Sequence, residues 1–193
     1  MDPDQFGLFD HEPVIKVELS LYMWLPKEVE AQINKFKEKA QTEVGKQRFS
    51  NSKPHITLFS ANMSQESAGK RAFKMLKALE SCSSVEFLAS QFQLFTSNKR
   101  TTLVLKVEPL NGYTEISNSI SIAALPSKGV TTADNLHITI FQFQNGSVDQ
   151  SFIDSFMIDT PSLHFKASRI SASFQNLENG QYNNLGGTTL KDS

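Results

Sequence analysis

The sequence predicts an α+β fold made of two similar halves that share one core. Three observations indicate this: apolar residues alternate with period two in some segments, they recur at helical spacing in others, and each half contains a strand, a helix and a histidine-bearing strand in that order. No linker or low-complexity stretch separates the halves. We therefore expect one domain over residues 14–193, preceded by a flexible arm over 1–13 that has two prolines and no periodic pattern.

The first half starts with a strongly alternating segment over 15–25, which predicts a long strand with one buried face that ends at Pro26. Helical spacing of apolar residues then predicts a helix that ends near Gly45 and has a stripe of Val29, Ile33, Phe36 and Ala40. A short strand over 54–59 follows. Ser64 is suited to cap a second helix, whose stripe is Ala68, Ala72, Leu76 and Leu79.

The second half repeats this plan. Segments 85–95 and 101–107 read as a strand pair that turns at Asn98 and Lys99, and a helix that carries Tyr113, Ile116 and Ile120 follows. A loop of small residues over 126–134 leads to a strand over 136–143. A short helix near Phe152 and Phe156 has only a weak pattern, and two final strands are expected over 162–174 and 182–190.

Composition and charge restrict the function classes. The chain has 19 Lys and Arg against 20 Asp and Glu, which gives a net charge of −1. This charge excludes the broad positive surface of a protein that binds long nucleic acid nonspecifically. It remains compatible with a pocket for a short oligonucleotide or nucleotide. The single cysteine, Cys82, cannot form an internal disulfide. The N-terminus lacks a signal-peptide pattern and no apolar stretch is long enough to cross a bilayer. We expect a cytoplasmic monomer without a membrane partner.

Two matched pentads carry the chemistry: His55-Ile56-Thr57-Leu58-Phe59 and His137-Ile138-Thr139-Ile140-Phe141. Because side chains at i, i+2 and i+4 share one face of a strand, each pentad predicts histidine, threonine and phenylalanine on one face and two aliphatic side chains in the core. If the halves pair around a pseudo-twofold axis, both histidines line one groove.

Two imidazoles and two hydroxyls suit the cleavage of a phosphodiester. One histidine can take a proton from the attacking oxygen and the other can give a proton to the leaving oxygen, since the unperturbed pKa of histidine lies near ~6.5. Thr57 and Thr139 can donate hydrogen bonds to the phosphate oxygens. For Phe59 and Phe141 two interpretations stay open, stacking on a nucleobase or packing in the core.

The other candidate residues carry weaker signals. Lys53 lies close enough in sequence to His55 to meet a phosphate, although a solvated lysine is the simpler interpretation. His11 and His164 lack the motif, and Cys82 has no paired histidine. The spacing of His, Asp and Glu provides no metal-ligand set, so we expect neither a metal nor a cofactor.

On these motifs the chain resembles the two-histidine (2H) phosphoesterase superfamily, which includes 2'-5' RNA ligase-like proteins, cyclic phosphodiesterases and viral 2',5'-oligoadenylate phosphodiesterases. Both H-x-[ST]-aliphatic motifs are intact, and the resemblance covers about residues 14–190. It implies a bilobal, duplicated fold, with two antiparallel-rich sheets around a central cleft and helices on the outside. By position, it implies that His55 and His137 are catalytic, that Thr57 and Thr139 hold the phosphate, and that no metal takes part.

The resemblance also implies the reaction, hydrolysis of a phosphodiester that involves a ribose 2'-oxygen. Candidate substrates are 2',5'-oligoadenylate and an RNA 2',3'-cyclic phosphate. Some members carry an arginine shortly after a motif, where this chain has Phe59-Ser60 and Phe141-Gln142. The alternative is a non-catalytic nucleotide- or RNA-binding module on the same fold, and ligation, the reverse reaction, is a third possibility.

Overall fold

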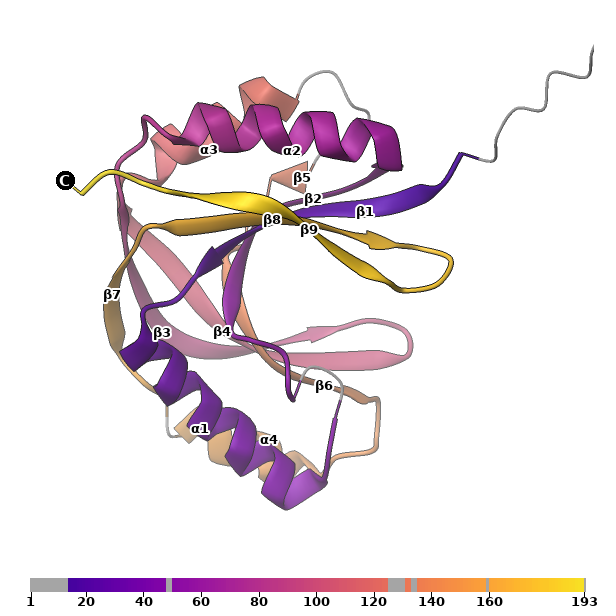
Figure 1. Ribbon diagram of the computed structural model, residues 1–193. Helices are drawn as coiled ribbons and strands as arrows, with labels where there is room; N and C mark the ends of the chain where they lie inside the picture. Colours follow the sequence, from indigo (N-terminus) through magenta and orange to yellow (C-terminus); the bar gives the residue numbers. More distant parts are fainter. Residues whose placement is uncertain (1–13, 48–49, 125–130, 133–134, 159, 193) are drawn as a thin grey trace, which may run out of the picture.

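The computed structural model describes residues 14–47, 50–124, 131–132, 135–158 and 160–192, so the predicted arm at 1–13 and most of the expected loop at 126–134 lie outside the described residues. The described residues form these elements in chain order (Figure 1): β1 (Lys16–Trp24), α1 (Lys27–Val44), β2 (His55–Ser64), α2 (Gln65–Leu79), β3 (Val85–Thr96), β4 (Arg100–Asn111), α3 (Tyr113–Ala124), β5 (Thr131–Thr132), β6 (His137–Gln144), α4 (Gln150–Ile158), β7 (Leu163–Ala167), β8 (Arg169–Asn176) and β9 (Tyr182–Thr189). None of the described helices has the length and apolar character needed to cross a membrane.

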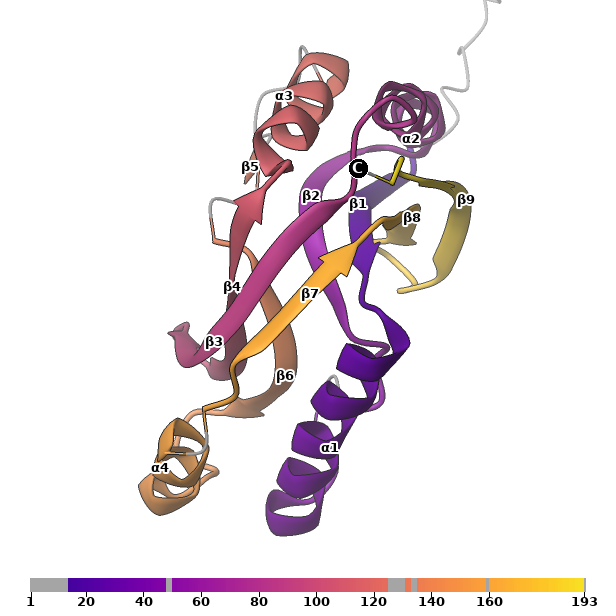
Figure 2. The same ribbon diagram turned by 90° about the vertical axis from the view of Figure 1, so that its left-hand side faces the viewer.

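The strands form one mainly antiparallel sheet in the order β7-β3-β4-β6-β2-β1-β8-β9, with β5 paired to β2. The expectation of two separate sheets was therefore wrong. A first strand group (β2, β1, β8 and β9) and a second strand group (β6, β4, β3 and β7) are joined where β2 and β6 pair at Ile56 and Ile138. The sheet is strongly curved rather than flat (Figure 2).

The helices lie in two pairs at opposite ends of the curled sheet (Figure 1; Figure 2). At one end α2 packs on β1, β8 and β9 with α3 beside it. At the other end α1 contacts β6, and the Phe36 ring of α1 lies 5.3 Å from that of Phe92 on β3. The α1 helix, which follows β1, thus covers the second strand group. Among the described residues, the buried side chains of both sequence halves form one continuous cluster.

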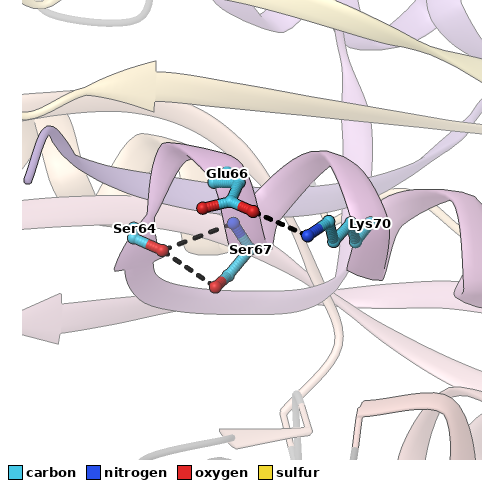
Figure 3. A network of polar contacts seen from close by, with 4 residues as sticks. All are labelled: Ser64, Glu66, Ser67 and Lys70. Carbon is cyan, nitrogen blue, oxygen red and sulfur yellow. Dashed lines mark hydrogen bonds and ion pairs between the residues drawn. The ribbon is translucent and has the colours of Figure 1, made fainter.

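Local signals in the sequence account for the borders of these helices. Gly45 ends α1 with a positive φ of 75°, a conformation that glycine adopts without a steric penalty. Ser64 caps α2: its hydroxyl accepts a hydrogen bond from the backbone N–H of Ser67 at 3.3 Å (Figure 3). In the next turn Lys70 and Glu66 form an i,i+4 ion pair at 2.6 Å. Both predicted helices are confirmed.

The segment predicted as one strand over 162–174 is two strands. Its first part, β7, pairs with β3, whereas its second part, β8, pairs with β1 in the other strand group. The chain crosses between the groups at Ser168, which lies between the two strands. The alternation of buried residues changes phase at this crossing: Leu163, Phe165 and Ala167 are buried before it, and Ile170, Ala172 and Phe174 after it. Ser168 and Arg169, two consecutive residues outside the core, were the local sign of the crossing.

A β-bulge in each histidine strand overturns part of the predicted face assignment. Leu21 and Tyr22 of β1 pair with Phe59 and Thr57, so that Leu58 is an extra residue in β2. In β6, Ile140 is likewise a bulge residue without a partner in the register, because the consecutive residues Leu103 and Val104 of β4 pair with Phe141 and Thr139. Such a bulge puts two consecutive side chains on the same face and reverses the alternation beyond it.

The bulges place Phe59 and Phe141 in the core, where both are 0% exposed. The interpretation that they stack on a nucleobase was therefore wrong, and core packing is confirmed. Ser60 and Gln142, one residue further on, are half-buried on the face that carries the histidines.

Replacing Phe141 with alanine should lower the free energy of unfolding by about 3–5 kcal/mol, because the substitution leaves a cavity among Phe143, Phe152 and Phe156. Urea denaturation followed by circular dichroism measures this loss. The matched control is Phe73→Ala on α2, since Phe73 is 68% exposed and should cost less than about 0.5 kcal/mol. Equal losses in the two variants would contradict the core position of Phe141.

Candidate active site

The candidate site is built on the pair of Ile56 and Ile138. Both isoleucines are fully buried, so their neighbours along each strand, His55 and Thr57 on β2 and His137 and Thr139 on β6, point to the opposite face and are half-buried. In an antiparallel register, His55 then stands opposite Thr139, and Thr57 opposite His137. The four predicted residues therefore meet on one face of the sheet, with the two histidines on a diagonal.

Each histidine ring is held by the same hydrogen bond to the backbone. Nδ1 of His55 donates to the carbonyl oxygen of Lys53 at 2.8 Å, and Nδ1 of His137 donates to that of Asn135 at 2.9 Å. A carbonyl oxygen can only accept, so Nδ1 carries a hydrogen in both rings. The other ring nitrogen, Nε2, is left to exchange a proton with a substrate. Sequence reasoning missed these two bonds, although each acceptor stands two residues before its histidine.

Aromatic side chains enclose both histidines. The Tyr22 and Trp24 rings on β1 lie edge-on to His55, with centroid distances of 4.5 and 5.9 Å, and Phe95 on β3 lies 5.0 Å from His137. Trp24 is fixed in turn, because its Nε1 donates to the hydroxyl of Ser171 at 2.7 Å. These contacts cover one side of each ring and restrict its rotation.

The pKa of His55 is lowered from its ordinary value, mainly because burial disfavours the charged ring. The bond to the Lys53 carbonyl opposes this effect, while the positive charges of Lys37 and of protonated His137 add to it. His55 is therefore neutral at neutral pH and able to accept a proton.

Lys37 is a part of the site that sequence reasoning missed. Its side chain on α1 is 3% exposed, and Nζ donates to the backbone oxygen and the hydroxyl of Ser52 at 2.7 and 3.0 Å. Burial lowers the pKa of Lys37 to about 8, so it is still charged at pH 7. The sequence did contain a sign that Lys37 is buried, because Lys37 follows Ile33 by four residues and so lies on the buried stripe of the helix.

A cavity of about 900 Å³ opens beside these residues, and His55, Thr57 and Thr139 lie on its wall. His137 is not among the residues that line it, although its proximity contributes to the lowered pKa of His55. Lys53 lines the mouth, where its Nζ lies 4.9 Å from the centre of the Trp24 ring and 3.6 Å from a carboxylate oxygen of Glu30. The side chain of Lys53 is 52% exposed, in agreement with the interpretation of a solvated lysine.

The two histidines have different neighbours across the strands. In register, Trp24 stands opposite His55, whereas Lys106 stands opposite His137. Lys106 forms an ion pair with Glu108 at 3.0 Å and is half-exposed. Across the neighbouring strand, His55 therefore has an aromatic residue and His137 a lysine, a difference that the matched pentads do not show.

The remaining candidates lie elsewhere. His164 is exposed on β7, Cys82 is buried with its sulfur 3.5 Å from the Ser119 hydroxyl, and His11 lies outside the described residues. In the described part of the chain, no three His, Cys, Asp or Glu side chains are grouped so that they could hold a metal ion.

The sequence of this chain matches the model of a known protein family. The sequence model of the 2'-5' RNA ligase superfamily matches residues 25–172. No curated protein sequence is significantly similar to the chain.

Solved structures of low sequence identity share the fold. TT0787 of Thermus thermophilus is 15% identical with a TM-score of 0.66, covering 91% of this chain and 99% of its own. LigT of E. coli in complex with 3'-AMP is 14% identical with a TM-score of 0.60 and the same coverage. Usb1 of Kluyveromyces marxianus is 13% identical with a TM-score of 0.53, covering 88% of this chain and 97% of its own.

The Lys37→Met variant should have a higher pKa at His55 than the wild type, because it removes a positive charge that disfavours the protonated ring. Titration of the histidine ring protons by NMR measures this change. Lys74→Met, an exposed lysine on α2, is the matched control and should leave the pKa of His55 unchanged. An identical His55 titration in the Lys37→Met variant and the wild type would show that Lys37 does not act on His55.

Proposed function

This chain belongs to the 2'-5' RNA ligase superfamily, the family of the 2H phosphoesterases, and on that basis we propose that it is a metal-independent phosphodiesterase. Its substrate is a phosphodiester that involves a ribose 2'-oxygen, in a 2',5'-oligoadenylate or an RNA 2',3'-cyclic phosphate. The observation that carries the proposal is the pair of histidines on one face of the β2–β6 junction, each with Nδ1 bound to a backbone carbonyl and each beside a threonine.

In the proposed mechanism, His55 is the general base and His137 the general acid. The lowered pKa of His55 supports this order, because a base must be unprotonated when the substrate binds. Nε2 of His55 takes a proton from the attacking oxygen as that oxygen bonds to phosphorus. The bond from phosphorus to the leaving ribose oxygen breaks, and His137 gives that oxygen a proton. The attacker is water for a cyclic phosphate, whereas the adjacent hydroxyl can attack in a linear linkage.

The phosphate itself is held by the two threonines. Their hydroxyls donate to the non-bridging oxygens, where negative charge concentrates in the transition state. Lys53 and Lys106 stand near His55 and His137 and supply the positive charge that an arginine after the motif supplies in some family members. A nucleotide as the substrate is supported by the fold, since LigT of E. coli, which shares it, is seen with 3'-AMP.

Replacing either motif histidine with alanine should lower kcat by roughly 10²–10⁴-fold, the usual contribution of one proton transfer. The assay incubates the protein with 2',5'-oligoadenylate or a nucleoside 2',3'-cyclic phosphate in EDTA and follows the products by chromatography. His164→Ala is the matched control, because His164 is exposed and lies on β7 outside the site. Wild-type turnover that disappears in EDTA, or that survives in both His55→Ala and His137→Ala, would refute the mechanism. Binding without any turnover would support the alternative of a non-catalytic module.

The pH dependence of kcat/KM should be bell-shaped, and its acidic limb reports His55. Activity falls as pH drops through the pKa of His55, which lies below the ordinary value of histidine, so the enzyme keeps its activity to a lower pH than an unperturbed histidine would allow. At high pH activity falls again as the general acid loses its proton. In the Lys37→Met variant the acidic limb should move to higher pH, and an unmoved limb would argue against His55 as the base.

A further inference from the structure

Lys37 reaches from α1 to the segment that precedes β2. Its Nζ donates to the backbone oxygen and to the hydroxyl of Ser52 at 2.7 and 3.0 Å. Ser52 is followed by Lys53, whose carbonyl oxygen accepts the hydrogen bond from Nδ1 of His55 at 2.8 Å. The ammonium group on the helix is therefore connected to the imidazole ring through two consecutive residues and their hydrogen bonds.

Pro54 makes this connection stiff. A residue that precedes proline is restricted to extended backbone conformations, because the proline ring clashes with it in the helical region. Lys53 is that residue, and Pro54 itself is buried. Because Ser52 is held on one side and Pro54 on the other, the Lys53 carbonyl has little freedom to turn away from His55.

The corresponding acceptor for His137 is held in a different way. Asn135 supplies the carbonyl there, at 2.9 Å from Nδ1. The next residue, Leu136, accepts a hydrogen bond from the backbone N–H of Val107 on β4 at 2.9 Å. Backbone pairing thus continues up to the residue before His137. In front of β2, the side chain of Lys37 supplies hydrogen bonds at the matching place.

The helix that carries Lys37 packs against the second strand group. It contacts β6, and the ring of Phe36, the residue before Lys37, lies 5.3 Å from the ring of Phe92 on β3. The two histidine strands, β2 and β6, share a single register pair. Lys37 therefore adds a second connection between the segment before the first histidine and the strand of the second histidine.

The burial of Lys37 indicates that this connection has a function. The side chain is 3% exposed, and burial lowers its pKa to about 8, because the charged form loses its contact with water. Lysine is rarely buried to this extent, since the removal of a charge from water is unfavourable. Groups with such perturbed pKa values are concentrated at functional sites. Methionine at this position would avoid the unfavourable burial but could not donate to Ser52.

We infer that Lys37 is a positioning residue, which fixes the His55 ring by holding the Lys53 carbonyl in place. The inference rests on the proposed function, in which Nε2 of His55 accepts a proton, and it adds a geometric role to the charge effect of Lys37. Which ring nitrogen carries the hydrogen is set by the hydrogen bond that the other part of the ring makes, so a displaced carbonyl allows both tautomers. A ring with its hydrogen on Nε2 cannot act as the base.

The tautomer of His55 tests the inference without any substrate. Long-range proton–nitrogen NMR of the histidine rings, at a mildly alkaline pH where histidine is neutral, distinguishes hydrogen on Nδ1 from hydrogen on Nε2. The wild type should show hydrogen on Nδ1 alone at His55. The Lys37→Met variant should show both tautomers at His55, whereas His137 in the same sample should stay unchanged. Hydrogen on Nδ1 alone at His55 in Lys37→Met would overturn the inference.

Two further variants complete this measurement. Lys74→Met replaces an exposed lysine on α2 and is the matched control, which should keep the wild-type tautomer at His55. Thermal melting monitors folding. If Lys37→Met does not fold, Lys37→Leu carries the test, because leucine also lacks a donor for Ser52 and fits an apolar helix stripe.

Turnover separates the geometric role of Lys37 from its charge. Loss of the charge alone moves the acidic limb of the pH profile but leaves the pH-independent kcat unchanged, whereas a misplaced ring lowers it. In Lys37→Met we expect this kcat to fall by roughly ten- to hundredfold with little change in KM, because Lys37 does not line the cavity. An unchanged pH-independent kcat would overturn the inference and leave the proposed function intact. Absence of turnover in a wild type that melts cooperatively would refute the proposed function, while the tautomer of His55 would still decide whether Lys37 positions the ring.

Discussion

The contact on which the site depends is the pairing of β2 with β6 at Ile56 and Ile138. This pair turns two groups of four strands into one sheet, and it also sets the two motifs side by side in opposite directions. The buried isoleucines fix the face on which the histidines and threonines stand. Strand pairing and catalytic geometry are therefore one constraint, because a shift of this register by one residue would turn the polar side chains toward the core.

Much of the fold can be predicted from the sequence, because its helices and its first strand depend on local patterns. Alternation along 15–25 and the helical stripes before Gly45 and after Ser64 are each typical of one kind of element, and the structure confirms them. The motifs likewise identify four residues that the sheet brings together. All of these predictions concern the secondary structure or the motif of one segment, which its own sequence determines without the strands that pack beside it.

The errors concern properties that arise only when strands meet. A bulge depends on how two strands hydrogen-bond, so alternation alone placed Phe59 and Phe141 on the wrong face. The single sheet is likewise a consequence of pairing between distant segments, whereas the crossing at Ser168 had a local sign, the change of phase in the alternation after Ala167. Lys37 was missed for a related reason: its proximity to Ser52 and His55 is tertiary, and the only local sign was a lysine on an apolar stripe.

The interleaved helices have a consequence for synthesis on the ribosome. The α1 helix emerges early, yet β6 and Phe92 of β3, against which its apolar stripe packs, are translated much later. The α2 helix likewise packs on β8 and β9, which are translated last. Until these strands and β6 leave the exit tunnel, neither end of the protein can complete its core, so the nascent first half exposes apolar surface of the kind that chaperones bind. The arrangement also makes most contacts long in sequence separation, which is typical of proteins that fold slowly.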